Sequence, residues 1–299
     1  MNVNFDIETS LKRSADLVEK ELQSYFEADD PLLSSILEAQ TYSLLGGGKR
    51  IRPYLVLAFC RLLGGEEKAA MPLACAIEMI HTYSLIHDDL PCMDNDDYRR
   101  GKLTNHKVYG EATAVLAGDA LLTKSFEVAV SAPHLSSDAK ARAVSLLSRS
   151  AGAYGMIGGQ MLDMNAPGAD DLDLAYLLKM HALKTGALIR ASAGLGCIAA
   201  GCGYNDEATV AADVYAQNIG LAFQVIDDIL DVIGDASALG KNVGGDQALN
   251  KLTFMRFYTV EEAKRYAETL TEAAIQAVSR YDRDGELAAL AGYLLHRTK

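Results

Sequence analysis

The sequence predicts an all-α fold whose helices pack into one domain, and three observations support this. Apolar residues recur at helical spacing along almost the whole chain, whereas no segment combines a sustained apolar–polar alternation with turn signals at strand spacing. No Pro/Ser-rich linker divides the 299 residues, so residues 1–299 are expected to form a single domain. Apolar residues make up 49% of the chain, which is enough for a sizeable core.

The first helix boundaries are predicted from proline and glycine. Pro31 follows two aspartates, as the first residue of a helix often does, and the helix that it begins ends at the glycines 46–48. Pro53 opens the next helix, which ends at Gly64. Further helices are expected at about 68–90, 112–131, 138–165, 171–200 and 206–232.

Two helices are expected after the longest loop. Thr259-Val-Glu-Glu262 is a capping box that opens one helix, and another runs from about Glu286 onward. Between residues 234 and 251 the chain is rich in glycine and charge, which predicts a flexible loop of the kind that often covers an active site.

Composition restricts the classes of partner and compartment. A net charge of -12 argues against a nucleic-acid partner and against an anionic membrane surface. The five cysteines are odd in number and lack metal-ligand spacing, so they are expected to be reduced thiols. The N-terminus lacks the pattern of a secretory signal, and the longest uncharged small-residue run, 191–204, is too short for a membrane span. A cytoplasmic protein without a membrane span is therefore expected.

The motif Asp227-Asp-Ile-Leu-Asp231 places two acids one helical turn apart. Side chains at i and i+4 leave the same face of a helix, so Asp227 and Asp231 repel each other unless a cation bridges them. Alone, such a motif could equally be a solvated acidic face. Apolar residues on both sides argue against that, and Mg2+ is a hard cation that prefers carboxylate oxygens.

A second acidic motif, Asp88-Asp-Leu-Pro-Cys-Met-Asp94, also follows an apolar helical run. Asp88 and Asp94 are six residues apart, which on a continuous helix would point them to different sides. Pro91 disfavours helical geometry at Leu90, so the helix should end there and let Asp94 curl back toward Asp88. The two motifs together predict an enzyme that holds a diphosphate through magnesium.

Basic residues suited to a diphosphate lie in two places. Arg99 and Arg100 follow the first acidic motif, and Gly47-Gly-Lys-Arg-Ile-Arg-Pro53 puts three cations into a tight turn between helices. The turn is not a P-loop, because no strand precedes it and its lysine is followed by arginine. Alone it would be read as a solvated helix junction.

Four segments in order carry a family resemblance: GGKRIRP, HTYSLIHDDLPCMDNDDYRRG, KTG at 184–186 and FQVIDDILDVIGD. The set resembles the signature of trans-isoprenyl diphosphate synthases, specifically bacterial farnesyl diphosphate synthases, and the likeness spans about residue 30 to the C-terminus. The resemblance implies a homodimeric bundle of long helices around a central cavity, with the acidic motifs facing each other across its mouth. It also implies three Mg2+ ions per active site, for which Mn2+ can substitute.

The resemblance further implies a role for each matching position. The metal ligands would be Asp88, Asp89, Asp94, Asp227, Asp228 and Asp231. The allylic diphosphate would be bound by Arg99, Lys184 and Lys241, and isopentenyl diphosphate by Lys49, Arg52, His81 and Arg100. The residues acting in catalysis would be Lys184, Thr185, Gln224 and Lys251, of which Thr185 and Gln224 face the allylic cation and Lys251 arrives with the flexible loop.

The reaction implied is ionisation, condensation and elimination, in which dimethylallyl and geranyl diphosphate react with isopentenyl diphosphate. The departing diphosphate would take the proton, so no protein base is named; His87 and His106 are expected to be structural. Tyr83 lies about 7.5 Å before Asp88 along a helix, at ~1.5 Å per residue. In the family an aromatic residue there accompanies a fifteen-carbon product, so farnesyl diphosphate is expected; Ser84 beside it is small.

Three alternatives remain at this point. A geranylgeranyl diphosphate synthase would differ only in cavity depth. A terpene cyclase would not need the basic turn or His81, and a non-catalytic helical subunit should have lost acids or cations that are present here. Two departures from the family pattern leave the metal ligands in place: Met255 puts the local path after Thr253 in doubt, and Asn95, where the family often has an acid, weakens the local negative charge.

Overall fold

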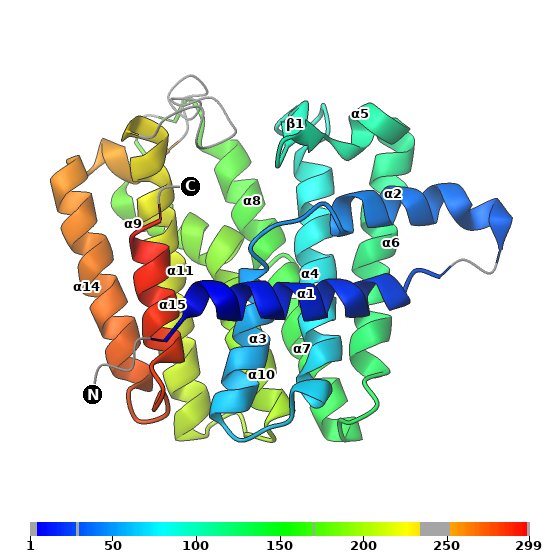
Figure 1. The fold of residues 1–299 in the computed structure, drawn as a ribbon. Coiled ribbons are helices and arrows are strands. Elements are labelled where there is room, and N and C mark those ends of the chain that lie inside the picture. Colours follow the sequence, from blue (N-terminus) through cyan, green and yellow to red (C-terminus); the bar gives the residue numbers. More distant parts are fainter. Residues whose placement is uncertain (1–4, 28–29, 170, 234–251, 298–299) are drawn as a thin grey trace. The chain divides into compact units, whose positions relative to one another are not determined.

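A computed structural model describes residues 5–27, 30–169, 171–233 and 252–297 of the chain (Figure 1). Helices make up most of these residues, and one short β-ribbon contains the only strands among them, so the all-α prediction is confirmed. The chain divides into two compact units, which are described separately. The N-terminal unit comprises Glu8–Val144 and Ile198–Ala200, and the C-terminal unit comprises Met1–Ile7, Ser145–Cys197 and Gly201–Lys299. The single domain remains a prediction.

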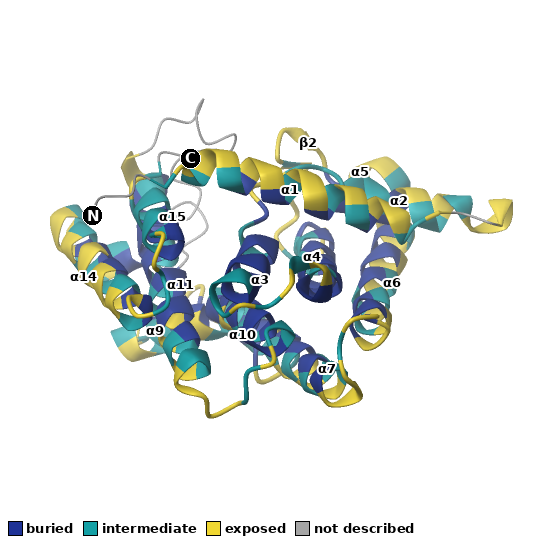
Figure 2. Cartoon of the chain, turned by 60° about the horizontal axis from the view of Figure 1, so that its bottom comes forward, coloured by how far each residue is buried: buried dark blue, intermediate teal, exposed yellow. Residues whose placement is uncertain are grey.

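The N-terminal unit is built around two buried helices. Figure 2 shows α3 and α4 buried on almost every side, while α1 and α2 cross over them. Helix α1 buries one stripe, Leu11, Ser14, Val18 and Leu22, whose spacing is that of one face of a helix. The elements of the N-terminal unit are α1 (Ile7–Ser24), η1 (Pro31–Leu33), α2 (Ser34–Leu44), α3 (Ile51–Leu62), α4 (Glu67–Asp88), β1 (Tyr98–Arg99), β2 (Lys102–Leu103), α5 (Asn105–Tyr109), α6 (Glu111–Val130) and the start of α7 (Ser137–Ala151).

Helix α4 is the core helix of this unit and carries the first acidic motif at its C-terminal end. Among the described helices it alone is long and apolar enough to cross a membrane, by length and composition. Of its most apolar window, 78% is buried within the fold, as in the core helix of a globular domain.

In the C-terminal unit, α11 packs against α14 and α15. Phe254, fully buried, lies in the core between α11 and α14 together with Val225, Ile229 and Ala263. The elements are α8 (Met156–Asn165), α9 (Leu174–His181), the π-helical turn η2 (Ala182–Gly186), α10 (Ala187–Ala199, of which 198–199 belong to the other unit), α11 (Glu207–Ile233), η3 (Phe254–Arg256), α14 (Val260–Val278) and α15 (Glu286–Leu295).

Several predicted boundaries are confirmed and others are wrong. The capping box forms, with Thr259 and Glu262 bonding each other's backbone N–H. The single helix expected at 138–165 is two helices, α7 and α8, because the chain bends at Gly152 and Gly155. The helix expected at 171–200 is interrupted by η2.

Four elements have no counterpart in the sequence prediction. They are α1, α5, η3 and the ribbon β1–β2, in which Arg99 pairs with Lys102. Its two-residue turn has positive φ at Arg100 (53°) and Gly101 (75°), as in a type I′ hairpin turn. Two-residue strands are too short for their alternation to be read from sequence.

Candidate active site

The first acidic motif curls at the end of α4 as predicted. The helix ends at Asp88, and the N–H of Asp94 donates to the carbonyl of Asp88 at 2.8 Å. This hydrogen bond closes the loop after Pro91 and brings the backbone of Asp94 back to the helix end. The expected proximity of Asp88 and Asp94 is therefore confirmed, while their role as ligands remains a prediction.

Asp89, between them, is held by the protein itself. Its carboxylate is buried and accepts from Arg99 Nε at 2.6 Å and Nη2 at 2.5 Å. Burial raises the pKa of the Asp89 carboxyl, and the bonds from Arg99 oppose this. Asp89 and Arg99, predicted for metal and for diphosphate, are thus engaged with each other. This pairing fixes the ribbon that carries Arg99 and Arg100 against the end of α4.

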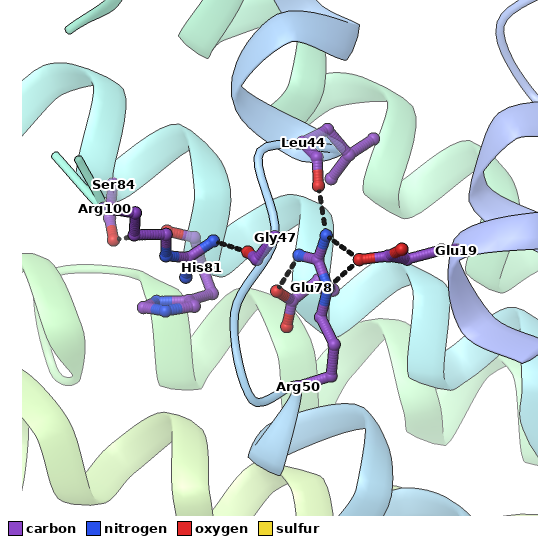
Figure 3. Close-up of polar contacts among 8 residues, drawn as sticks. All are labelled: Glu19, Leu44, Gly47, Arg50, Glu78, His81, Ser84 and Arg100. Atoms are coloured by element: carbon purple, nitrogen blue, oxygen red, sulfur yellow. Dashed lines mark hydrogen bonds and ion pairs between the residues drawn. The ribbon is translucent and has the colours of Figure 1, made fainter. Parts of the chain in front are cut away.

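The basic turn between α2 and α3 has an unusual backbone. Gly47, Gly48 and Arg50 all have positive φ (87°, 125° and 50°), and a Cβ at Gly48 would lie 2.7 Å from the Arg100 guanidinium carbon. The positive φ favours glycine there, and the guanidinium of Arg100 passes over the turn and donates to the carbonyl of Gly47 (Figure 3). Lys49 is exposed.

Arg52, His81 and Arg100 form a cluster of nitrogen-bearing groups in this unit. Burial, and after it Arg100, lowers the pKa of Arg52 to about 10, although Glu78 opposes this. Its Nε is buried and has no hydrogen-bond partner among the described residues. Burial and then the neighbouring arginines hold the pKa of His81 well below its usual range, so His81 is neutral at pH 7. A cluster of this kind fits an anion such as a diphosphate.

Tyr83 and His87 lie one turn apart on α4. Tyr83 is buried, its ring meets that of His87 edge-on at 5.7 Å, and its hydroxyl has no partner among the described residues. His87 Nε2 lies 3.0 Å from the carbonyl of Val115 in α6, which confirms its predicted structural packing. Ser84 instead donates to the carbonyl of His81 at 2.9 Å, along its own helix. His106 is also buried.

The second acidic motif lies in α11 of the C-terminal unit. Asp227 and Asp231 are one turn apart on one helix, as predicted. Asp228 is buried and accepts from the backbone N–H of Phe254 at 2.7 Å, so one of its oxygens holds η3 in place. Asp227 accepts from Arg297.

Lys184 and Thr185 are presented by the π-helical turn η2, a type of helical irregularity common at functional sites. Lys184 Nζ lies 2.5 Å from Oδ2 of Asp163 in α8. A Cβ at Gly159 would overlap the backbone nitrogen of Lys184, so glycine there allows α8 to approach this turn. Thr185 Oγ1 donates to Gln224 Oε1 at 2.8 Å, which joins η2 to α11. The two residues expected to face the allylic cation are therefore in contact.

Sequence reasoning missed four residues that hold these groups: Glu19, Glu78, Asp163 and Arg297. Each lies outside the acidic and basic motifs, so only a partner distant in the chain reveals it. Lys241 and Lys251 lie outside the described residues.

The carboxylates suit magnesium, although no group of three His, Cys, Asp or Glu close enough to hold a metal ion forms within either described unit. One or two carboxylates, with water and substrate phosphate completing the shell, are the usual way Mg2+ is bound. Three of the predicted ligands also accept from the protein: Asp89 from Arg99, Asp228 from the backbone of Phe254 and Asp227 from Arg297.

Comparison with known proteins decides the family, since the polyprenyl synthetase model matches residues 34–290. The chain belongs to the polyprenyl synthetase family. It is 48% identical to the heterodimeric geranylgeranyl pyrophosphate synthase large subunit 1, chloroplastic, of Arabidopsis thaliana, over 98% of this chain and 80% of that protein. It is 43% identical to geranylgeranyl diphosphate synthase of Cyanophora paradoxa, over 99% and 98%.

A solved member of the family has the same fold. The geranyltransferase of Helicobacter pylori, complexed with magnesium and isoprenyl diphosphate, is 35% identical with a TM-score of 0.81, over 98% of this chain and 97% of that one. The resemblance to trans-isoprenyl diphosphate synthases is thereby confirmed. As a polyprenyl synthetase, the chain is a prenyltransferase, whereas the farnesyl product expected from the sequence is not confirmed.

Proposed function

We propose that this prenyltransferase condenses isopentenyl diphosphate with allylic diphosphates until geranylgeranyl diphosphate is formed. The observation that carries the twenty-carbon product is the similarity, over nearly the whole chain, to two relatives that are named geranylgeranyl synthases. The farnesyl product, expected from Tyr83 alone, becomes the second candidate.

Isopentenyl diphosphate is assigned to the basic turn of the N-terminal unit. Its phosphates would be bound by Lys49, Arg52 and Arg100, with neutral His81 as a hydrogen-bonding group. The buried Nε of Arg52, unpartnered among the described residues, and the repulsion from Arg100 that lowers the pKa of Arg52 support this assignment, because a bound anion would relieve both. Guanidinium groups bind phosphate through paired N–H donors, which suits a diphosphate better than a monoanion.

The allylic diphosphate is assigned to the acidic motifs, where Asp88, Asp94, Asp227 and Asp231 would hold Mg2+. Bound magnesium would neutralise the charge that develops on the leaving diphosphate. Positive charge at the phosphates would come from Arg99, Lys184, Lys241 and Lys251, of which the last two lie outside the described residues. Asp163 keeps Lys184 oriented, at 2.5 Å.

The bond changes follow from this assignment. The allylic C–O bond breaks and its electrons leave with the diphosphate; the cation then forms a C–C bond with the double bond of isopentenyl diphosphate. The proton lost from the condensed product passes to the diphosphate. Thr185 and Gln224, joined at 2.8 Å, would stabilise the cation through their oxygen dipoles.

A product analysis tests the proposal. Purified protein is incubated with Mg2+, dimethylallyl diphosphate and labelled isopentenyl diphosphate, and the chain length is measured after dephosphorylation. A twenty-carbon alcohol is expected. A fifteen-carbon alcohol would instead establish the farnesyl candidate, and no condensation would favour a cyclase or a non-catalytic subunit.

The farnesyl candidate rests on one specific residue. Tyr83 is large and buried, and it lies on α4 just over one turn before Asp88. A ring at this depth could stop elongation at fifteen carbons.

A homodimer is proposed as the assembly, with α6 as the contact. The exposed apolar side chains Val115, Leu116 and Val130 lie on this helix, and a second copy would cover them. Light scattering should give twice the chain mass of 32.1 kDa. The cytoplasmic location remains a prediction.

A further inference from the structure

Arg50, in the middle of the basic turn, points into the N-terminal unit (Figure 3). Its side chain is fully buried. Nη1 donates to Glu78 Oε1 at 2.5 Å, Nη2 to Glu19 Oε1 at 3.0 Å and to the carbonyl of Leu44 at 2.6 Å, and Nε to Glu19 at 3.3 Å. Figure 3 shows the guanidinium enclosed by these groups. Four of its five N–H donors are therefore used within the protein.

These bonds connect the turn to three helices. Leu44 ends α2, Glu19 belongs to α1 and Glu78 to α4. Arg50 itself has a left-handed backbone (φ 50°, ψ 39°), which residues with a side chain rarely adopt and which its buried contacts maintain. Its conformation sets the direction of the backbone between Lys49 and Arg52.

Glu78 is placed to act on the substrate-binding cations as well. It is 2% exposed and lies one turn before His81 on α4. Burial lowers the pKa of Arg52 and of Arg100, and the charge of Glu78 opposes this lowering in both, while Glu78 itself bonds Arg50. Without it, close approach of Arg52 and Arg100 would be opposed by their mutual repulsion.

Glu19 supports the Arg50 guanidinium from the more exposed side. Its side chain is 37% exposed, and its place is set by the neighbouring Val18, buried in the apolar stripe of α1, and by Ser10, whose hydroxyl lies 3.0 Å from that of Tyr54 in α3. The family model begins at residue 34, so α1 lies outside the matched region.

We infer that Glu19 and Glu78 are positioning residues for isopentenyl diphosphate, acting through Arg50 on the turn that carries Lys49 and Arg52. The inference rests on the proposed function, because it takes that turn as the isopentenyl diphosphate site. It assigns a role in substrate recognition to α1, and it makes Arg50 part of the support of the turn rather than a ligand of the substrate.

The test compares Glu19→Ala and Glu19→Gln with a control on the same helix, Asp16→Ala, whose side chain is exposed. Isopentenyl diphosphate is titrated calorimetrically without allylic substrate, and KM for each substrate, kcat and Tm are measured. Glu19→Ala should weaken isopentenyl diphosphate binding about fivefold, the upper end of the usual effect of a solvent-exposed ion pair. KM for dimethylallyl diphosphate and kcat should stay within about twofold. The isopentenyl diphosphate affinity of Glu19→Gln should lie between those of Glu19→Ala and the wild type, and the affinity of Asp16→Ala should match the wild type.

Two results would overturn the inference. One is unchanged isopentenyl diphosphate affinity in Glu19→Ala. The other is a parallel loss in both KM values and kcat with a lowered Tm, which would indicate a merely structural role. Glu78→Gln, checked for folding by circular dichroism, should show the same selective effect. A wild-type protein that neither binds nor consumes isopentenyl diphosphate would refute the proposed function itself, which separates the two failures.

Discussion

Arg297 forms an ion pair with Asp227, the first acid of the second motif. Its Nη2 lies 3.0 Å from Oδ1 of Asp227 and 3.0 Å from the carbonyl of Phe223, and the guanidinium lies 3.7 Å from the centre of the Phe223 ring. The arginine side chain is 7% exposed and that of Asp227 is 41% exposed, so the contact is buried on the arginine side only. Arg297 thus holds one carboxylate oxygen of Asp227, and this contact sets the orientation of the other oxygen.

Replacement of Arg297 by Ala should raise the Mg2+ concentration needed for half-maximal activity about tenfold, the usual effect of removing a hydrogen bond that orients a metal ligand. Mn2+ titration followed by electron paramagnetic resonance should show the same weakening without turnover. Arg280→Ala is the control, because its ion pair with Glu207 is exposed at the surface. Tighter metal binding in Arg297→Ala would mean that the arginine competes with the metal.

Asp88→Ala and Asp227→Ala should each lower kcat by at least about 100-fold, since the charge on the leaving diphosphate would lose its electrostatic stabilisation. Circular dichroism should show an unchanged helix content. Asp284→Ala, an exposed acid near the start of α15, should retain full activity. Near-normal turnover in either variant would remove that residue from the site.

Tyr83→Ala should lengthen the product by at least one five-carbon unit if the ring forms the floor of the chain-binding space. Tyr83→Phe keeps the ring, and it should leave the product length unchanged because the hydroxyl has no partner among the described residues. Chromatography of the dephosphorylated products gives the answer. The same product from all three proteins would place the floor elsewhere.

His181 should make the fold acid-sensitive. It is buried and stacked on Phe254 with ring centres 5.4 Å apart, and burial lowers its pKa to about 4. Between pH 6.5 and 4 the unfolded chain takes up a proton at His181 and the folded chain does not. Its contribution to stability is therefore complete above pH 6.5 and is lost toward pH 4, to a total of about 3 kcal/mol.

Urea unfolding at pH 7 and pH 4.5 measures this effect. The free energy of unfolding of the wild type should fall about 2 kcal/mol more than that of His181→Gln between these pH values. His134→Gln replaces an exposed histidine and should follow the wild type. Equal pH dependence in His181→Gln and wild type would assign the acid sensitivity to other groups.

Local signals explain what was predictable about this fold. Pro91 ends α4 and returns Asp94 to Asp88, and Thr259 with Glu262 starts α14, because both effects depend on residues a few positions apart. The interruption of a helix by η2 was not predictable, since its close contact with Gly159 of α8 comes from packing between segments far apart in the chain.

The sequence by itself determined the helical class, the acidic and basic motifs and the family that they indicate, because helical periodicity and motif spacing are local properties. Only the tertiary structure decided how each charge is used. Arg50 turns inward to Glu78 and Glu19, and Asp89 is taken by Arg99. The physical reason is that a buried charge needs a counter-ion, and the fold brings that counter-ion from another part of the chain.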